Sequence, residues 1–300
     1  MLPPHPIWAS ADNKMLALRT FPVEECFRAV LGSLTFIWRG IFMVSSLIPV
    51  YVLIGLLAGI LVFLEIGWRI GKRQRAAGDV SMEGISAMDG AVFALLGLFI
   101  AFTFSAAVVR FEARRQTIVA EANAIGTAWL RLDMLSPETQ PAFRDLFRRY
   151  TDSRIGVYQK LPDLKAARQE LARGADLQKK IWAQAVSLAR ASMSPVIAMT
   201  VLPPLNQMFD IATSRTMSAE MHTPRVVFVL LFVLSLVSSL FAGYTMVSDK
   251  KRNWLHVIGF ALILAVSVFV IVDLEFPRLG IIQIDKSVDQ VMVDLRSSMK

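Results

Sequence analysis

The sequence predicts an all-α integral membrane protein with four transmembrane helices and a helical extramembrane domain between the second and third. Of its 300 residues, 55% are hydrophobic, above the roughly 45–50% of ordinary soluble domains. Four apolar stretches approach the roughly 20 residues that a helix needs to cross hydrocarbon. No segment alternates with a period of two, so strands are not expected.

The four predicted spans are residues 41–64, 88–109, 226–247 and 254–272. Inside them the only ionisable side chains are Asp89 and His256, and both stand at a span end. Taken in order, the spans form two transmembrane hairpins, residues 41–110 and 225–275. The chain should therefore remain in the lipid bilayer.

The first 40 residues are predicted to form an interfacial segment on the membrane surface. Apolar residues recur at helical spacing, and Trp38 and Arg39 stand next to the first span, as in helices that lie in the interface. A simple lead-in to the first span is the alternative. The extreme N-terminus lacks the pattern of a signal peptide, and Cys26, the only cysteine, excludes an intrachain disulfide.

Residues 111–224 form the predicted extramembrane domain. Its helices are the extension of the second span to Leu135, a helix from Pro137 to Gln159 after the N-cap Ser136, and a helix from Asp163 to Ser192. Residues 195–224 contain Pro203-Pro204 and Asp210, which predicts a partly buried or re-entrant helix broken by the prolines. Residues 276–300 are predicted to be a C-terminal tail.

The net charge of +8 collects at the span ends. Basic residues close the first span and fill the loop between the third and fourth, namely Arg69, Lys72, Arg73, Arg75, Lys250, Lys251 and Arg252. The positive-inside rule places both hairpin turns in the cytoplasm and the extramembrane domain outside. Nucleic-acid binding is not predicted.

Enzymatic motifs are missing. His5, His222 and His256 are scattered, so one chain does not predict a metal site. The sequence contains neither a Walker-type phosphate loop nor a Gly-x-Ser-x-Gly elbow. We therefore predict no catalytic residue, no metal and no cofactor.

The second span carries a stripe of small residues at intervals of three or four, formed by Gly90, Ala94, Gly97, Ala101 and Ser105. Such a stripe lets another helix approach closely. Two interpretations follow from spacing alone: packing between helices of one subunit, or the lining of a pore.

Residues 95–114, LLGLFIAFTFSAAVVRFEAR, resemble the second transmembrane helix of bestrophins, which are pentameric anion channels. Residues 121–132, EANAIGTAWLRL, follow as the family's continuing cytosolic helix does, and residues 272–280, VDLEFPRLG, are similar to its acidic turn after the last span. The chain resembles still more closely a bacterial membrane family described as bestrophin-like. The resemblance covers roughly residues 88–132 and 226–285.

The resemblance implies a homopentameric chloride channel of the bacterial plasma membrane. Its partners would be lipid, other copies of the chain and permeant anions. Five copies of the second span would line the pore, with a neck at Ala94, Leu98 and Phe102 that gates by dewetting. Thr103 and Ser105 would offer hydroxyl contacts. The helix that contains the second span would change from apolar to charged residues half way along, because it leaves the bilayer there while staying within the oligomer.

Charged residues complete these expectations. Arg110, Arg114 and Arg115 follow the neck and would concentrate anions as an electrostatic funnel. Asp273 and Glu275 would contact Arg110 or Arg114 as a structural link between helices, or form an acidic ring at a pore mouth.

Two further charged patterns are predicted to be structural. Glu65 should form a helical ion pair with Arg69. Asp285, Asp289 and Asp294 are spaced along a helix, so a calcium site is not predicted.

The orientation in the membrane is undecided, because bestrophins keep their middle helices in the cytosol whereas the positive-inside count places them outside.

Two functions other than a channel also remain open. The chain would otherwise be a non-conducting membrane scaffold or stress sensor that binds a protein partner through the middle helices. A transporter accessory subunit is a third hypothesis, although the inverted repeats typical of transporters are not found.

Overall fold

A computed structural model describes residues 48–77, 83–161, 163–191, 195–247, 253–278 and 280–300. Within these ranges every regular element is a helix, as predicted. The predicted interfacial segment, Cys26 and the beginning of the first span lie outside the described residues. The described residues belong to one compact unit, Ser46–Lys300.

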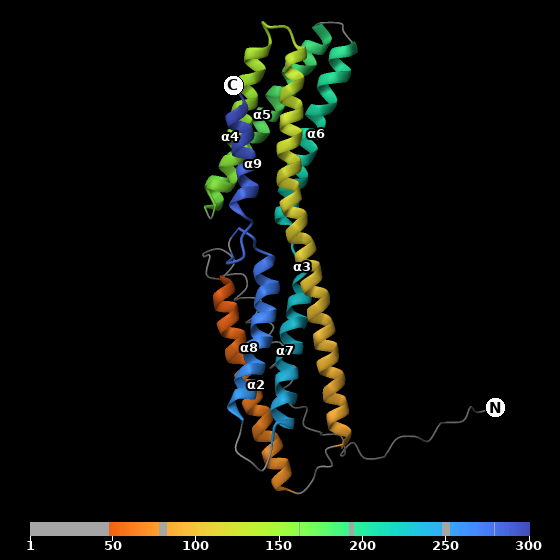
Figure 1. Cartoon of the computed structure of the whole chain (residues 1–300), viewed down its shortest axis with the longest axis vertical. Coiled ribbons are helices and arrows are strands. Elements are labelled where there is room, and N and C mark those ends of the chain that lie inside the picture. Colours follow the sequence, from red (N-terminus) through yellow and green to blue (C-terminus); the bar gives the residue numbers. More distant parts are fainter. Residues whose placement is uncertain (1–47, 78–82, 162, 192–194, 248–252, 279) are drawn as a thin grey trace, which may run out of the picture. The chain divides into compact units, whose positions relative to one another are not determined.

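Four helices carry segments long and apolar enough to cross a membrane, which confirms the predicted number. They are α2 (Ile48–Ala76), α3 (Glu83–Arg131), α7 (Arg225–Thr245) and α8 (Trp254–Leu274). α2 packs on α7 and α8, and α3 packs on the same two helices (Figure 1). The rings of Phe93 and Phe260 meet edge to face between α3 and α8, with centroids 6.2 Å apart.

Glycines set the close crossing of α2 and α7. A Cβ atom on Gly67 would overlap the backbone carbonyl of Leu240, and one on Gly243 would overlap that of Leu64. Each glycine therefore lies directly against the backbone of the opposite helix. Small residues at such crossings are typical of membrane helices, which gain their association from close packing.

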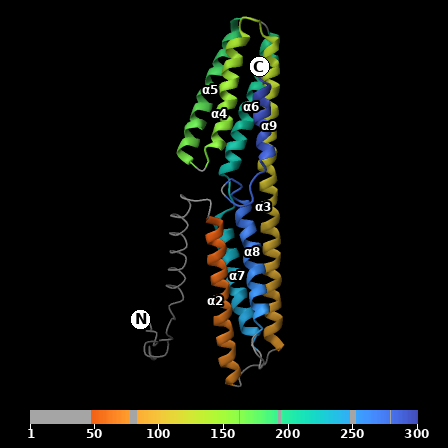
Figure 2. The ribbon, with the colours of Figure 1, turned by 60° about the vertical axis from the view of Figure 1, so that its left-hand side comes forward.

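The remaining helices build a second group beside the C-terminal half of α3 (Figure 2). They are α4 (Gln140–Gln159), α5 (Leu164–Ala191), α6 (Pro195–Glu220) and α9 (Lys286–Ser298), with a short 3-10 helix, η1 (Leu132–Met134), after α3. Their core contains Ile125 of α3, Phe147 of α4, Ile181 of α5, Leu205 of α6 and Met292 of α9.

α3 runs without interruption from the membrane group into this second group. No Pro or Gly stands between Thr103 and Ile125 to end the helix. The surroundings change instead, because Leu96 and Ala107 pack among the apolar helices whereas Ile118 and Ile125 belong to the extramembrane core. One helix therefore passes from one environment to the other without a break in the sequence.

The structure corrects three details of the sequence prediction. Helix α4 begins at Gln140 rather than Pro137, because residues 136–139 form a turn closed by the Thr139 amide and the Ser136 carbonyl at 2.9 Å. The C-terminal residues are not a tail, since α9 buries Val288 and Met292 in the extramembrane core.

The third correction concerns α6, which continues through Pro203 and Pro204. The predicted break is wrong because Val201, Leu205 and Met208 are buried in the core on both sides of the prolines. Tertiary packing of this kind stabilises a helix that local propensity disfavours.

Candidate functional site

The membrane half of α3 has two distinct faces. Leu96, Thr103 and Ala107 are buried against other helices of the chain. On the other side, Leu98 is 53% exposed and Phe102 is 65% exposed. The chain's own described helices leave these large apolar side chains uncovered.

The small-residue stripe lies on the exposed side of α3. Ala94, Ala101 and Ser105 are exposed, and so are Gly90 and Gly97. Apart from the adjoining backbone of α3 itself, no described atom lies within 4 Å of a Cβ placed on Gly90 or Gly97. Packing within one subunit, the first interpretation of this stripe, therefore does not account for it among the described residues.

Thr103 differs from its predicted neighbours. Its side chain is buried, and its hydroxyl donates to the backbone carbonyl of Phe99 at 2.8 Å. A second contact, with the Ile100 carbonyl, is 3.0 Å long. The expectation that Thr103 offers its hydroxyl to a pore is corrected accordingly, whereas Ser105 stays on the exposed face.

Beyond the membrane half, an ionic junction joins α3, the α6–α7 connection and the end of α8. Arg110 Nε donates to Glu275 Oε1 at 2.7 Å, and Thr223 Oγ1 donates to the same oxygen at 2.6 Å. His222 Nδ1 lies 3.8 Å from Oε2 of Glu275. The carboxylate at the centre of this junction is buried, since Glu275 is 1% exposed.

The environment of Glu275 favours its charged form. Burial alone would raise the pKa of this carboxyl, but the contact with His222 and the hydrogen bonds from Thr223 and Arg110 outweigh burial. The pKa of Glu275 is lowered to about 2. The carboxylate therefore remains ionised at every physiological pH.

Arg114 caps the end of α6. Its guanidinium donates to the carbonyls of Ser218 at 3.0 Å and Met221 at 2.8 Å, and to the backbone carbonyl of Glu275 at 3.1 Å. Cations at a helix C-terminus satisfy carbonyls that have no partner within the helix. Because its side chain is only 7% exposed, Arg114 is corrected from a funnel residue to a structural one.

Asp273 holds the turn after α8. Its two carboxylate oxygens accept from the backbone amides of Ile281 at 2.9 Å and Ile282 at 2.6 Å. A Cβ atom on Gly280 would overlap the same carboxylate. Asp273 thus serves the chain turn, while Glu275 contacts both Arg110 and Arg114.

The remaining predicted charges lie at the surface. Arg115 is partly exposed and its Nη1 donates to Glu112 at 2.8 Å. The predicted ion pair between Glu65 and Arg69 is confirmed, with a distance of 2.8 Å.

The sequence did not predict a second buried charged cluster, which is centred on Glu121. Glu121 is fully buried in the extramembrane core, where Arg154 and Arg215 both donate to its carboxylate. Its sequence signal is weak: Glu121 follows Arg114 by seven residues on the buried side of α3. Its two partners lie 33 and 94 residues away in the chain, so only the fold brings them together.

Metal binding finds no support in the described ranges. No group of three His, Cys, Asp or Glu side chains there is arranged to hold a metal ion. His222 and His256 lie in different parts of the chain, and His5 lies outside the described residues.

Comparisons with known proteins relate the chain to one family. The model of the bestrophin-like domain matches residues 54–289, while no curated protein matches the sequence. A crystal structure of a bacterial bestrophin homolog from Klebsiella pneumoniae superposes with a TM-score of 0.60 at 14% identity, covering 81% of this chain and 98% of that one. A single-residue variant of the homolog from the same organism gives 0.60 at 14% identity, with 82% and 99% covered.

A further crystal structure, described only as that of a membrane protein with one substitution, gives a TM-score of 0.61 at 14% identity. Here 82% of this chain and 96% of that chain are covered. At these identities the structures establish a shared fold. The family model spans most of the sequence and establishes membership. The chain belongs to the bestrophin-like family of integral membrane proteins.

Proposed function

We propose that the chain is the subunit of a homopentameric anion channel of a bacterial plasma membrane, with α3 lining the pore. Ala94, Leu98 and Phe102 form its hydrophobic neck, and Ser105 adds a hydroxyl contact. Chloride is the expected permeant ion.

One observation carries the proposal: the small-residue stripe of α3 packs against no described part of its own chain. Small residues in a membrane helix allow close approach of a neighbouring helix, and we infer that this helix belongs to another subunit. Lipid does not require such a stripe. Several copies that meet along α3 would surround an axis, which is the arrangement that a pore needs.

The neck residues share one helical face. Leu98 and Phe102 are four residues apart, and the same face continues through Ser105 and Val109 at helical intervals. All four are exposed in the single chain. A ring of leucine and phenylalanine side chains controls ion passage by excluding water.

The proposed arginine funnel consists of Arg110 and Arg115. The side chains of Arg110 and Arg115 are 32% and 38% exposed, respectively. Each is paired with a carboxylate, Glu275 or Glu112, so the attraction they exert on anions is reduced. The positive electrostatic potential of these arginines would raise the local anion concentration, and dissolved salt would screen it.

The proposal is tested by chloride efflux from liposomes that contain the purified chain. Phe102→Ala should increase efflux several-fold over the wild type, because it widens the neck and lowers the barrier to wetting. Phe104→Ala is the matched control, since Phe104 is also exposed but is two residues away and therefore on another side of the helix.

The mass of the detergent-solubilised particle provides the second measurement. A five-chain particle with chloride efflux supports the proposal. A monomer or dimer would eliminate the central pore. A five-chain particle without efflux, in both the wild type and the Phe102→Ala variant, would support a membrane scaffold instead.

A further inference from the structure

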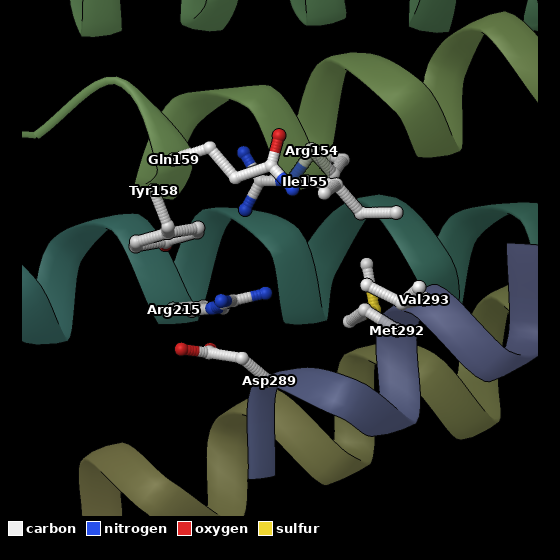
Figure 3. Close-up of a pocket in the computed structure, with 8 residues that line it drawn as sticks. All are labelled: Arg154, Ile155, Tyr158, Gln159, Arg215, Asp289, Met292 and Val293. Atoms are coloured by element: carbon white, nitrogen blue, oxygen red, sulfur yellow. The ribbon is translucent and has the colours of Figure 1, made fainter. Parts of the chain in front are cut away.

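The extramembrane helices line a cavity of about 180 Å³ between α4, α6 and α9 (Figure 3). Its walls include Arg154, Ile155 and Tyr158 of α4, Arg215 of α6, and Met292 and Val293 of α9. The volume is roughly ten times what a single water molecule needs. The cavity is far from the proposed neck, because Glu121, which binds both arginines, follows Phe102 by 19 residues, about 28 Å along α3.

The charges around this cavity do not balance. Arg154 and Arg215 are 5% and 4% exposed, and both share the single carboxylate of Glu121. Arg215 Nη1 lies 2.5 Å from Glu121 Oε2. Two buried cations therefore face one buried anion.

Neighbouring groups do not supply the missing negative charge. Asp289 also lines the cavity, but both of its carboxylate oxygens accept from Arg278, with Nη2 and Oδ1 2.8 Å apart. Burial raises the pKa of Tyr150 to about 12, so its phenol stays neutral. Burial alone would lower the pKa of the Arg154 guanidinium, but Glu121 outweighs burial and raises it. One excess positive charge remains.

The guanidinium groups also keep unused hydrogen-bonding capacity. Arg154 donates through Nε to Glu121 and through Nη2 to the Ala212 carbonyl at 3.3 Å, while Arg215 uses Nη1. Arg215 Nε is buried and finds no partner among the described residues. Each guanidinium has five N–H donors, and a buried donor without a partner is costly.

The geometry orients these donors. The Arg215 guanidinium carbon lies 3.8 Å from the centre of the Tyr158 ring, and this stacking restrains the guanidinium plane. In Figure 3 the Arg215 side chain lies between Tyr158 and Asp289, at the edge of the cavity. Ile155, Met292 and Val293 provide an apolar wall on the other side. A small molecule with a planar anionic head group and a short apolar tail would complement the guanidinium groups and the apolar wall, respectively.

We propose that this cavity binds a small organic carboxylate, whose head group lies at Arg154 and Arg215 and whose hydrocarbon part lies against Ile155, Met292 and Val293. Carboxylates match the planar fork of a guanidinium. The site is separate from the pore and does not depend on ion conduction.

Butyrate titrated into the full-length chain in detergent, followed by calorimetry, tests the proposal. Saturable binding at one butyrate per chain is expected, and butyramide, which has the same shape without the charge, should bind at least tenfold more weakly. Val293→Phe fills the cavity without touching the charged cluster and should weaken butyrate binding at least tenfold. Ile155→Phe fills the same apolar part of the cavity from α4 rather than from α9, in case one variant folds poorly.

Val119→Phe is the matched control, because Val119 is similarly exposed on α3 and does not line the cavity. It should bind butyrate as the wild type does. Equal binding of butyrate and butyramide, unchanged binding in both cavity-filling variants, absence of saturable binding, or preference for sulfate over butyrate would each overturn the proposal. Chloride efflux is not measured, so this result is independent of the channel test.

Discussion

Arg110 of α3 and Glu275 at the end of α8 are 165 residues apart in sequence and joined by a hydrogen bond of 2.7 Å. The same carboxylate accepts from Thr223 in the connection between α6 and α7. Three separate parts of the chain thus meet at one buried acid. The junction lies where α3 passes from the membrane helices to the extramembrane helices.

Replacing Glu275 should destabilise the protein. Glu275→Gln leaves the Arg110 and Arg114 guanidiniums without their shared charge, which we expect to cost about 2–3 kcal/mol, less than for a fully buried pair because Arg110 is partly exposed. The thermal unfolding midpoint in detergent should fall by roughly 5 °C. Asp145→Asn, which removes an exposed pair with Arg149, is the control and should change it little. Equal effects of the two variants would contradict this role of the junction.

Stability should also depend on pH through Glu275. Its pKa is lowered from 4.5 to about 2 in the folded protein. The stabilisation is therefore complete above the unfolded value and is lost as pH falls through 4.5 toward 2. The midpoint measured between pH values of about 7 and about 3 should drop less in Glu275→Gln than in the wild type. Parallel curves for both proteins would show that other carboxylates dominate.

The crossing of α2 and α7 should not tolerate a methyl group. Gly67→Ala places a Cβ against the Leu240 backbone carbonyl, and overpacking of this kind costs about 1–3 kcal/mol. Gly55→Ala on the same helix meets nothing within 4 Å and serves as the control. The measurement is the thermal unfolding midpoint of each variant in detergent. A Gly67→Ala variant as stable as Gly55→Ala would refute the close crossing of α2 and α7.

Removing a proline from α6 should stabilise the protein. Pro203 is exposed within a continuous helix, so Pro203→Ala restores an amide donor without disturbing the core. The expected gain is about 1–3 kcal/mol. Pro137→Ala, in the turn before α4, should instead be neutral or slightly destabilising. A lower midpoint for Pro203→Ala would mean that the proline conformation is needed for packing.

Thr103 should be dispensable for ion flux. Its hydroxyl bonds to the carbonyls of Phe99 and Ile100 on its own helix. Thr103→Val should therefore leave chloride efflux within about twofold of the wild type, since that hydroxyl already has partners. A large decrease in efflux, with the particle mass unchanged, would instead indicate that the Thr103 side chain contributes to the pore.

Much of the fold was available from the sequence because the signals are local. Hydrocarbon thickness and helical rise fix the length of a span, so composition alone revealed four of them. The continuity of α3 followed from the lack of Pro and Gly after Thr103. The motif around Arg110 and Glu275 also identified the family before any contact between these residues was known.

The tertiary structure decided what local signals do not encode. Pro203 and Pro204 stay helical because the core on either side of them outweighs their local preference. Helical geometry points Thr103 and Phe102 in different directions, but only the packing of α3 on the other helices decides that Thr103 is buried and Phe102 is exposed. Arg154 and Arg215 converge on Glu121 from distant points in the chain. Sequence determines which segments become helices, whereas long-range packing determines which charges they bury together.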